Sequence, residues 1–259
     1  MPLRYTRTLT GSDRTQRADK QIGTLLAFIA GAVNAGGFLA VHQYTSHMTG
    51  IVSTIADELI LGAYHVVLGG VAALVCFLCG TICTTMIVNY ARVHRLRSEY
   101  AAPLLLEAVL LLCFGVLGTR MADLQGFFVP ITVMMLSFLM GLQNALITKL
   151  SRSVIRTTHV TGIVTDIGIE LGKLIYWNRG RTATDGTHFV VADRARLQLH
   201  CALLLAFFSG GTLGAWGFSH IGYIATVPLA CVLVLISFIP LFDDIQAWLV
   251  GRRAPDASD

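Results

Sequence analysis

Six long apolar runs constrain the fold of this 259-residue chain more than any other feature. No water in the hydrocarbon core of a bilayer can satisfy backbone polar groups, so a chain that crosses it forms helices or a closed barrel. A helix needs roughly 20 apolar residues to span that core. The runs have 19 or more residues each and cover 22–41, 66–91, 101–119, 127–148, 197–217 and 221–242. They predict an all-α integral membrane protein with about six transmembrane helices.

Composition agrees with a chain that faces lipid. The mean hydropathy is +0.68 and only 13% of the residues are charged, whereas a soluble domain carries about 25%. So few charges cannot cover a water-facing surface. We therefore expect one membrane domain, residues 22–242, with the lipid bilayer as its partner. Residues 1–21 form a basic tail and residues 243–259 a C-terminal tail.

The distribution of basic residues predicts the orientation. Two shorter apolar stretches, 49–62 and 161–172, reach only about 20 Å at ~1.5 Å per residue. If neither crosses, 18 of the 19 Lys and Arg residues lie on one side, and Arg120 is the exception; if both cross, the division is 13 to 6. Cytoplasmic loops carry the excess of Lys and Arg. Six crossings with both termini in the cytoplasm are predicted, and the basic N-terminal tail is interpreted as an orientation signal rather than a nucleic-acid site.

A repeat divides the domain into halves, 22–119 and 127–242. Two motifs occur once in each half: Gly31-Ala-Val-Asn34-Ala35 with Gly141-Leu-Gln143-Asn144-Ala145, and His47-Met-Thr49-Gly50 with His159-Val-Thr161-Gly162. From the histidines onward, eight of thirteen positions are identical at an offset of 112. A weaker alignment pairs Gly80-Thr81 with Gly211-Thr212. Because the first half starts inside and the second outside, we expect a 3+3 inverted repeat, a recurring plan of secondary transporters.

Each His-x-Thr-Gly segment is predicted to open a short, non-spanning helix. Thr is a favoured N-cap, and Gly allows close approach of backbone or ligand. The N–H groups at a helix start attract anionic or carbonyl oxygen. Two re-entrant helices of this kind can converge on a polar cavity near the bilayer midplane. The alternative is a pair of interfacial helices, capped by Thr, with no ligand.

The amides of Asn34, Gln143 and Asn144 lie inside spanning helices, where an unpaired amide is costly. They either line a solute path or form hydrogen bonds across helices that hold the halves together. Gly31, Asn34 and Ala35 share one helix face, which predicts a close helix contact with an amide beside it.

Ionisable residues complete the candidate site. The two motif histidines either support the helix starts or relay protons; they have no further ligands at metal spacing, so no metal or other cofactor is expected. Asp57 and Asp166 face either a cavity or water, Glu58 and Glu170 tie helix ends to the rim, and Glu107 is expected to snorkel outward. The candidate substrate-binding set is Asn34, His47, Thr49, Gly50, Asp57, Gln143, Asn144, His159, Thr161, Gly162 and Asp166.

Other patterns limit the function classes. All six cysteines lie in apolar runs and are expected to pack between helices, without disulfides. The chain has no P-loop, Gly-x-Ser-x-Gly elbow, His-Glu-x-x-His or Rossmann fingerprint, so we do not expect an enzyme.

At its paired motifs the chain resembles the YoaK family of uncharacterised multi-pass membrane proteins, found mainly in bacteria. The resemblance covers about residues 22–242 and rests on the Gly31, Gly141, Met48-Thr49-Gly50 and Thr157-Thr158-His159-Val160-Thr161-Gly162 motifs. It implies a bacterial inner-membrane location. Family members commonly carry Asn directly after the first Thr-Gly, where this chain has Ile51. The resemblance implies an architecture but no substrate.

These patterns favour a secondary transporter, or a channel, for a small polar or anionic solute bound near the midplane between inverted repeats. The alternative is an intramembrane scaffold or sensor whose polar residues only pack helices. A homo-oligomer is compatible with either.

Overall fold

In the computed structural model, the described residues, 16–94, 96, 98–121, 125–151, 155–176 and 190–251, are helical apart from short connections. Residues 1–15 and 177–189, which carry part of the predicted charge asymmetry, lie outside this set. The elements are α2 (Gln16–Val41), α3 (Met48–Leu61), α4 (Tyr64–Val93), α5 (Ala101–Met121), α6 (Gln125–Leu150), α7 (Val160–Ile175), α8 (Arg194–Ile221), the 3-10 turn η1 (Gly222–Ala225) and α9 (Thr226–Gly251).

Five segments of the described chain are long and apolar enough to cross a membrane: Arg17–Val41, Tyr64–Val93, Ala101–Arg120, Val129–Leu150 and Arg194–Phe238. The last has 45 residues and takes in α8, η1 and the first half of α9. Within it the backbone turns at Gly222, whose φ is +63°. The predicted all-helical membrane architecture is therefore confirmed.

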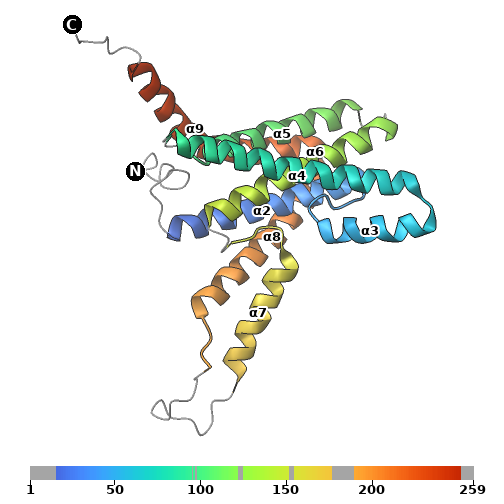
Figure 1. Cartoon of the computed structure of the whole chain (residues 1–259), viewed down its shortest axis with the longest axis horizontal. Helices are drawn as coiled ribbons and strands as arrows, with labels where there is room; N and C mark the ends of the chain where they lie inside the picture. The colour runs from blue at the N-terminus through green and yellow to red at the C-terminus, as the bar shows by residue number, and fades with distance from the viewer. Residues whose placement is uncertain are drawn as a thin grey trace.

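The two motif segments open short helices, α3 with 14 residues and α7 with 16. Figure 1 draws α3 beside the first part of α4, with its start toward the middle of the molecule. In the same view α7 lies beside α8, and its start is also drawn toward the middle. Gly62 ends α3 in the left-handed region at φ +78°, a conformation that favours glycine and permits the sharp turn into α4.

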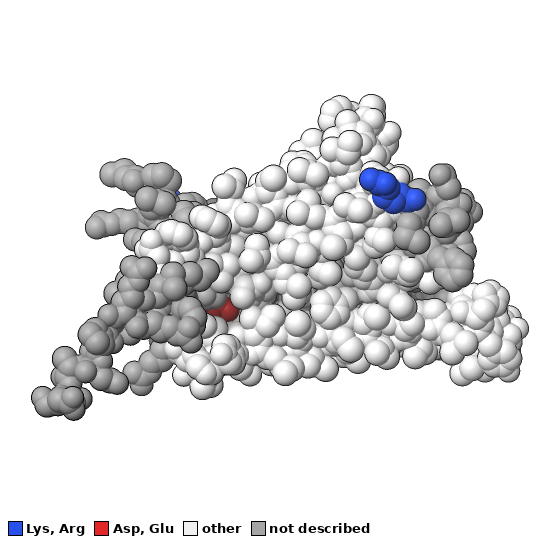
Figure 2. Space-filling model, turned by 90° about the horizontal axis from the view of Figure 1, so that it is seen from above, with Lys and Arg blue, Asp and Glu red and all other residues white. Residues whose placement is uncertain are grey.

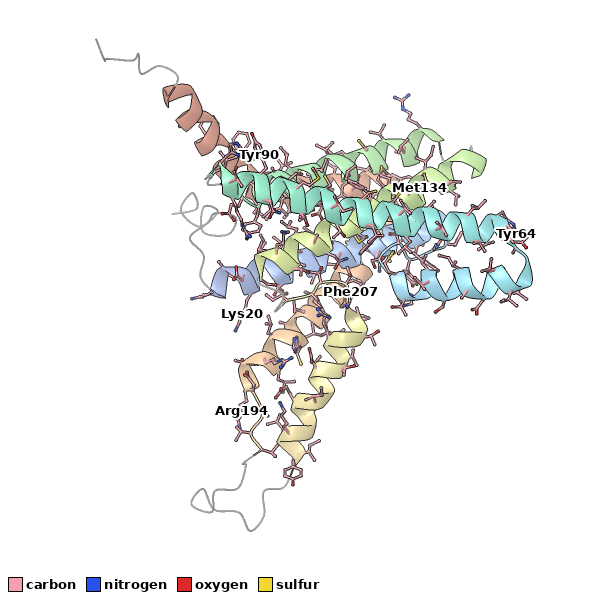
Figure 3. All side chains as sticks on the ribbon, viewed as in Figure 1. Lys20, Tyr64, Tyr90, Met134, Arg194 and Phe207 are labelled. Carbon is pink, nitrogen blue, oxygen red and sulfur yellow. The ribbon has the colours of Figure 1, made fainter. Side chains whose placement is uncertain are left out.

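The core consists of closely packed helix pairs, α2 with α8, α4 with α6 and α5 with α9. At the first pair Gly31 lies against the backbone of Phe207, and Gly210 lies against the backbone of Phe28. A Cβ at either glycine would overlap a carbonyl oxygen of the facing helix. The close helix contact predicted at Gly31 is thus confirmed, and Figure 3 labels Phe207 where α8 approaches α2.

The second pair repeats this contact. Gly80 of α4 lies against the backbone of Phe138, and Gly141 of α6 lies against that of Phe77. Gly80 therefore takes the place that Gly210 has in the first pair, so the predicted alignment with Gly211 was wrong by one residue. It followed the identical Gly-Thr dipeptides, whereas the packing depends only on which residue faces the partner backbone.

Threonine hydroxyls reinforce the α4–α6 contact. Thr81 donates to the Gly141 carbonyl at 3.2 Å, and the buried Thr84 donates to the Leu142 carbonyl at 3.0 Å. Hydrogen bonds between helices supplement van der Waals packing where lipid supplies no hydrophobic driving force between them.

The outer surface is apolar. Figure 2 shows a face on which charged atoms occur only toward the two ends. Along α4, Leu68 and Met86 are 70% and 66% exposed, and the exposed rings of Tyr64 and Tyr90 mark opposite ends of the helix in Figure 3. All six cysteines are free, and Cys79, Cys113 and Cys231 are exposed. The expectation that every cysteine packs between helices was wrong for these three, because a small apolar thiol is equally compatible with lipid.

We predict that Gly31→Ala and Gly80→Ala each destabilise the protein by about 1–3 kcal/mol, because the added methyl forces paired helices apart. Gly172→Ala is the matched control, since a Cβ there meets nothing within 4 Å. Thermal unfolding in detergent, followed by size-exclusion chromatography, measures the effect. Equal stability of Gly31→Ala and Gly172→Ala would contradict the packing described.

Candidate functional site

Asn34 of α2 holds the segment that leads into α3. The Ser46 hydroxyl donates to the Asn34 side-chain oxygen at 3.0 Å. Between them the chain reverses through His42, whose φ is +53°, and buries the side chain of Thr45. The amide thereby fixes the position of the first motif segment, residues 46–50, relative to α2.

Asn144 of α6 does the same for the second motif segment, residues 158–162. The Thr158 hydroxyl donates to the Asn144 side-chain oxygen at 2.7 Å, and the Asn144 amide donates to the Met140 carbonyl at 2.9 Å. Neither hydrogen bond joins the two halves, so the suggestion that these asparagines hold the halves together was wrong. Each binds the segment that follows its own helix.

The short helices begin one residue before the threonines. His47 and His159 are the N-cap residues, and their carbonyls accept from Ile51 at 3.1 Å and Ile163 at 3.0 Å. The prediction that Thr caps each helix was therefore wrong, because Thr49 and Thr161 already lie in the first turn.

Neither histidine caps its helix with its side chain. Among the described residues, no hydrogen bond uses the N–H groups of 48–50 or 160–162. These donors remain at a helix start, where the peptide dipoles produce a partial positive charge.

The two helix starts differ in what covers them. A Cβ on Gly50 would come within 2.5 Å of Nδ1 of His47, so this imidazole lies over the first turn of α3. A Cβ on Gly162 would meet nothing within 4 Å, so the start of α7 is open. Thr49, Thr161 and both histidines are exposed. Although His159 is exposed, neighbouring protein atoms desolvate part of its ring and lower its pKa, and the charge of nearby Arg156 lowers it further, which favours the neutral imidazole.

Asp166 of α7 is paired with α8 and does not face the other half. Its carboxylate lies 3.3 Å from Nη2 of Arg196 and 3.6 Å from Nε2 of His200. One turn further on, the buried carboxylate of Glu170 accepts from Lys173 and from the backbone N–H of Asp193, both at 2.8 Å. These bonds, first that of Lys173, lower the pKa of Glu170. The cluster fastens α7 to the start of α8.

The remaining candidates are separate from the motif segments. Asp57 is exposed on α3, and Gln143 is buried in α6, where its amide donates to the Leu26 carbonyl of α2 at 3.2 Å. A hollow of about 210 Å³ lies between α3, α4 and α6, and its walls include Gln43 and Thr54 but not Asp57.

A larger hollow, about 640 Å³, lies between α2 and α8. Neither of these hollows is lined by both motif segments. The structure thus gives the two segments matching local geometry, and neither of these two hollows provides them with a common wall.

Sequence reasoning missed four residues with defined roles: Ser46, Thr158, Arg196 and His200. The first two have a recognisable signal, since each is a hydroxyl residue directly before a motif histidine and 12 or 14 residues after the asparagine it meets. Arg196 and His200 have none, because they lie 30 or more residues from Asp166 and meet it only in the fold.

We predict that Thr158→Val destabilises the protein by about 1–3 kcal/mol, because the half-buried side-chain oxygen of Asn144 loses its donor. Thr165→Val is the matched control, since the exposed Thr165 hydroxyl bonds only its own helix, at the Thr161 carbonyl. In a double-mutant cycle, Thr158→Val and Asn144→Val should couple by about 0.5–3 kcal/mol in thermal unfolding. Additive effects would mean that the hydrogen bond contributes nothing.

Comparison with known proteins places this geometry in a family. The chain matches the family described as a protein of unknown function, DUF1275, over residues 22–239. It is 29% identical to UPF0700 transmembrane protein YoaK of Bacillus subtilis over 163 residues, which cover 61% of this chain and 70% of the relative. No solved structure gives a significant match. The matched region contains both motif segments and most of the helices described above, and the chain belongs to the DUF1275 family of transmembrane proteins of unknown function.

Proposed function

We propose that the protein is a secondary transporter, or a channel, for a small polar or anionic solute in the bacterial inner membrane, and that it is not an enzyme. The starts of α3 and α7 are the proposed binding elements. The observation that carries this proposal is the pair of asparagine-bound motif segments, each of which presents unused N–H donors at a helix start. Such donors suit the oxygen atoms of a carboxylate or a phosphate, or a halide ion.

Repetition within the fold supports the transporter plan. The α2–α8 contact has a counterpart in α6–α4, and α3–α4 has one in α7–α8. The glycine contacts at Gly31 and Gly141 match as well. In Figure 1, α2 and α6 run in opposite directions, as an inverted 3+3 repeat requires. Alternating access then follows from rocking one half against the other around a shared site.

Six crossings are proposed by counting α9 as a separate span. It has 26 residues, about 39 Å at the usual rise, and packs antiparallel on α5, since Gly115 meets Thr226 and Gly118 meets Tyr223. Figure 1 draws the start of α2 and the end of α9 toward the same end. The excess of Lys and Arg in 92–100, 149–160 and 173–196 then makes both termini cytoplasmic under the positive-inside rule.

A scaffold or sensor without transport activity is the second candidate. It is favoured by the hydrogen-bonded side-chain oxygens of Asn34 and Asn144 and by hollows that do not join the two motif segments. In that function the asparagines only stabilise two connections, and the N–H groups are solvated.

The topology has a direct test. Single cysteines placed in 92–100, 149–160 and 173–196, in a background without the native six, should resist impermeant thiol reagents in intact cells and react after permeabilisation. A cysteine beside Arg120 is the external control and should react at once. Labelling of two of the three loops from outside would contradict six crossings.

The binding site is tested by solute uptake into reconstituted vesicles, with chloride, inorganic phosphate, acetate and glycine as probes. Thr49→Val combined with Thr161→Val keeps shape and removes two exposed hydroxyls beside the N–H donors. We expect uptake of the transported probe to fall about three- to tenfold, the value of one or two hydrogen bonds. Thr165→Val should transport normally.

Normal uptake by the double variant would exclude the motif segments as the binding site. Absence of uptake by the wild-type protein for every probe, in vesicles where it is folded, would favour the scaffold.

A further inference from the structure

Glu107 of α5 is a buried carboxyl that the proposed binding site does not use. Its exposed fraction is 0%, and neither Oε1 nor Oε2 has a hydrogen-bond partner. The expectation that this side chain snorkels to the membrane surface was wrong, because α5 turns its Glu107 face toward other helices. Leu104, Ala108 and Leu111 of the same face are also fully buried.

The core into which α5 packs is largely apolar. α5 packs mainly on α9 and α6, whose core residues include Leu233 and Met140. From the antiparallel contact of Gly115 with Thr226, the level of Glu107 falls near Leu233 of α9. Pro240 lies in α9 and has no N–H, so the Ile236 carbonyl lacks its usual helix donor. That acceptor lies within about one helical turn of the Glu107 level.

Among the side chains that the structure describes, no cation on the packed helices compensates Glu107. Lys149 of α6 bonds Asn89 at 3.2 Å, and Arg92 of α4 pairs with Glu99 at 3.0 Å. Tyr223 of η1 packs at the far end of α5, against Phe114, and Cys231 of α9 is exposed. The other titratable residues of α4 are exposed or half-buried: Tyr64, His65, Cys76, Cys79, Cys83 and Tyr90. The side chains of Asp243 and Asp244 lie outside those that the structure describes.

An ionised carboxylate in such a setting is costly, because burial removes its hydration and no hydrogen bond or ion pair replaces it. In the packing described, the group is therefore neutral. Ionisation requires that water or a cation reach it, and this requires α5 to separate from α6 or α9. A protein with two such packings binds a proton in one and releases it in the other.

We infer that Glu107 is a proton-binding site whose occupancy is linked to the packing of α5 against α6 and α9. Proton coupling of solute movement through this site rests on the proposed transport function. The proton site itself does not, so the two can fail separately.

Dicyclohexylcarbodiimide, an apolar reagent that reacts with protonated carboxyls, tests the proton site in the full-length protein reconstituted in lipid vesicles. Peptide mass spectrometry should find the adduct on Glu107, and its yield should fall about tenfold per pH unit once the group ionises. Glu107→Gln, which retains the shape of the neutral carboxyl, should fold normally and lose the adduct. Glu99→Gln is the control and should keep it, because Glu99 is paired with Arg92.

Two outcomes would overturn the proton site. One is the absence of an adduct on Glu107 at any pH in folded wild-type protein. The other is an adduct whose yield does not change with pH up to the point of unfolding, which would mean a carboxyl that is permanently neutral. Both readings come from the wild-type chain, so they stand even if Glu107→Gln fails to fold.

Coupling is measured with vesicles that contain a pH-sensitive dye and receive chloride, inorganic phosphate, acetate or glycine. With wild-type protein, uptake should carry protons; with Glu107→Gln, proton movement should disappear while solute exchange remains. Proton movement that persists in Glu107→Gln would refute the coupling. If the wild-type protein moves no probe, transport fails, and the carbodiimide result alone decides the proton site.

Discussion

Contact between glycine surfaces and facing backbone is the interaction on which the other features of the structure depend. At α2–α8 and α4–α6 the helices approach so closely that a single methyl at Gly31 or Gly80 would overlap a carbonyl oxygen. In lipid, where apolar burial does not drive helices together, such proximity maximises dispersion contacts and admits hydrogen bonds such as Thr84 to the Leu142 carbonyl. Because the two pairs join helices that are distant in sequence, they also connect the two halves of the chain.

Those pairs determine where the motif segments lie. α2 and α6 each end beside a segment that folds back, and Asn34 and Asn144 bind it through Ser46 and Thr158. An amide inside an apolar helix is costly unless it is bonded, so each asparagine makes its connection specific. The result is two helix starts with unused N–H donors, an arrangement that can serve a solute. Transport is the better description if both helix starts border one cavity, and scaffolding is the better description if they do not.

Much of the site was predictable from the sequence, and the predictions that were wrong failed for identifiable reasons. The repeated Asn and His-x-Thr-Gly motifs were visible because identical residues recur in order, and the short helices follow them as expected. The cap assignment was wrong because it followed the preference of Thr for N-cap positions, whereas the helices begin one residue earlier, at Met48 and Val160. For Asp166 the sequence left a cavity and water as alternatives, because its partners Arg196 and His200 are remote in sequence. Glu107 was placed at the surface because only helix packing shows which way α5 turns.

The sequence by itself determined that this chain is a helical membrane protein with duplicated motifs. The length of an apolar run and the identity of its residues are local properties. In a bilayer of fixed thickness, where every backbone polar group needs a partner, they suffice to predict spanning helices. The tertiary structure decided which faces of those helices meet, and therefore that Glu107 is buried, that Asp166 is paired and that Gly80 corresponds to Gly210. In a chain whose outer and inner surfaces are both apolar, hydrophobic periodicity does not tell which side of a helix faces lipid and which side packs in the core. Only the contacts between distant helices make that distinction.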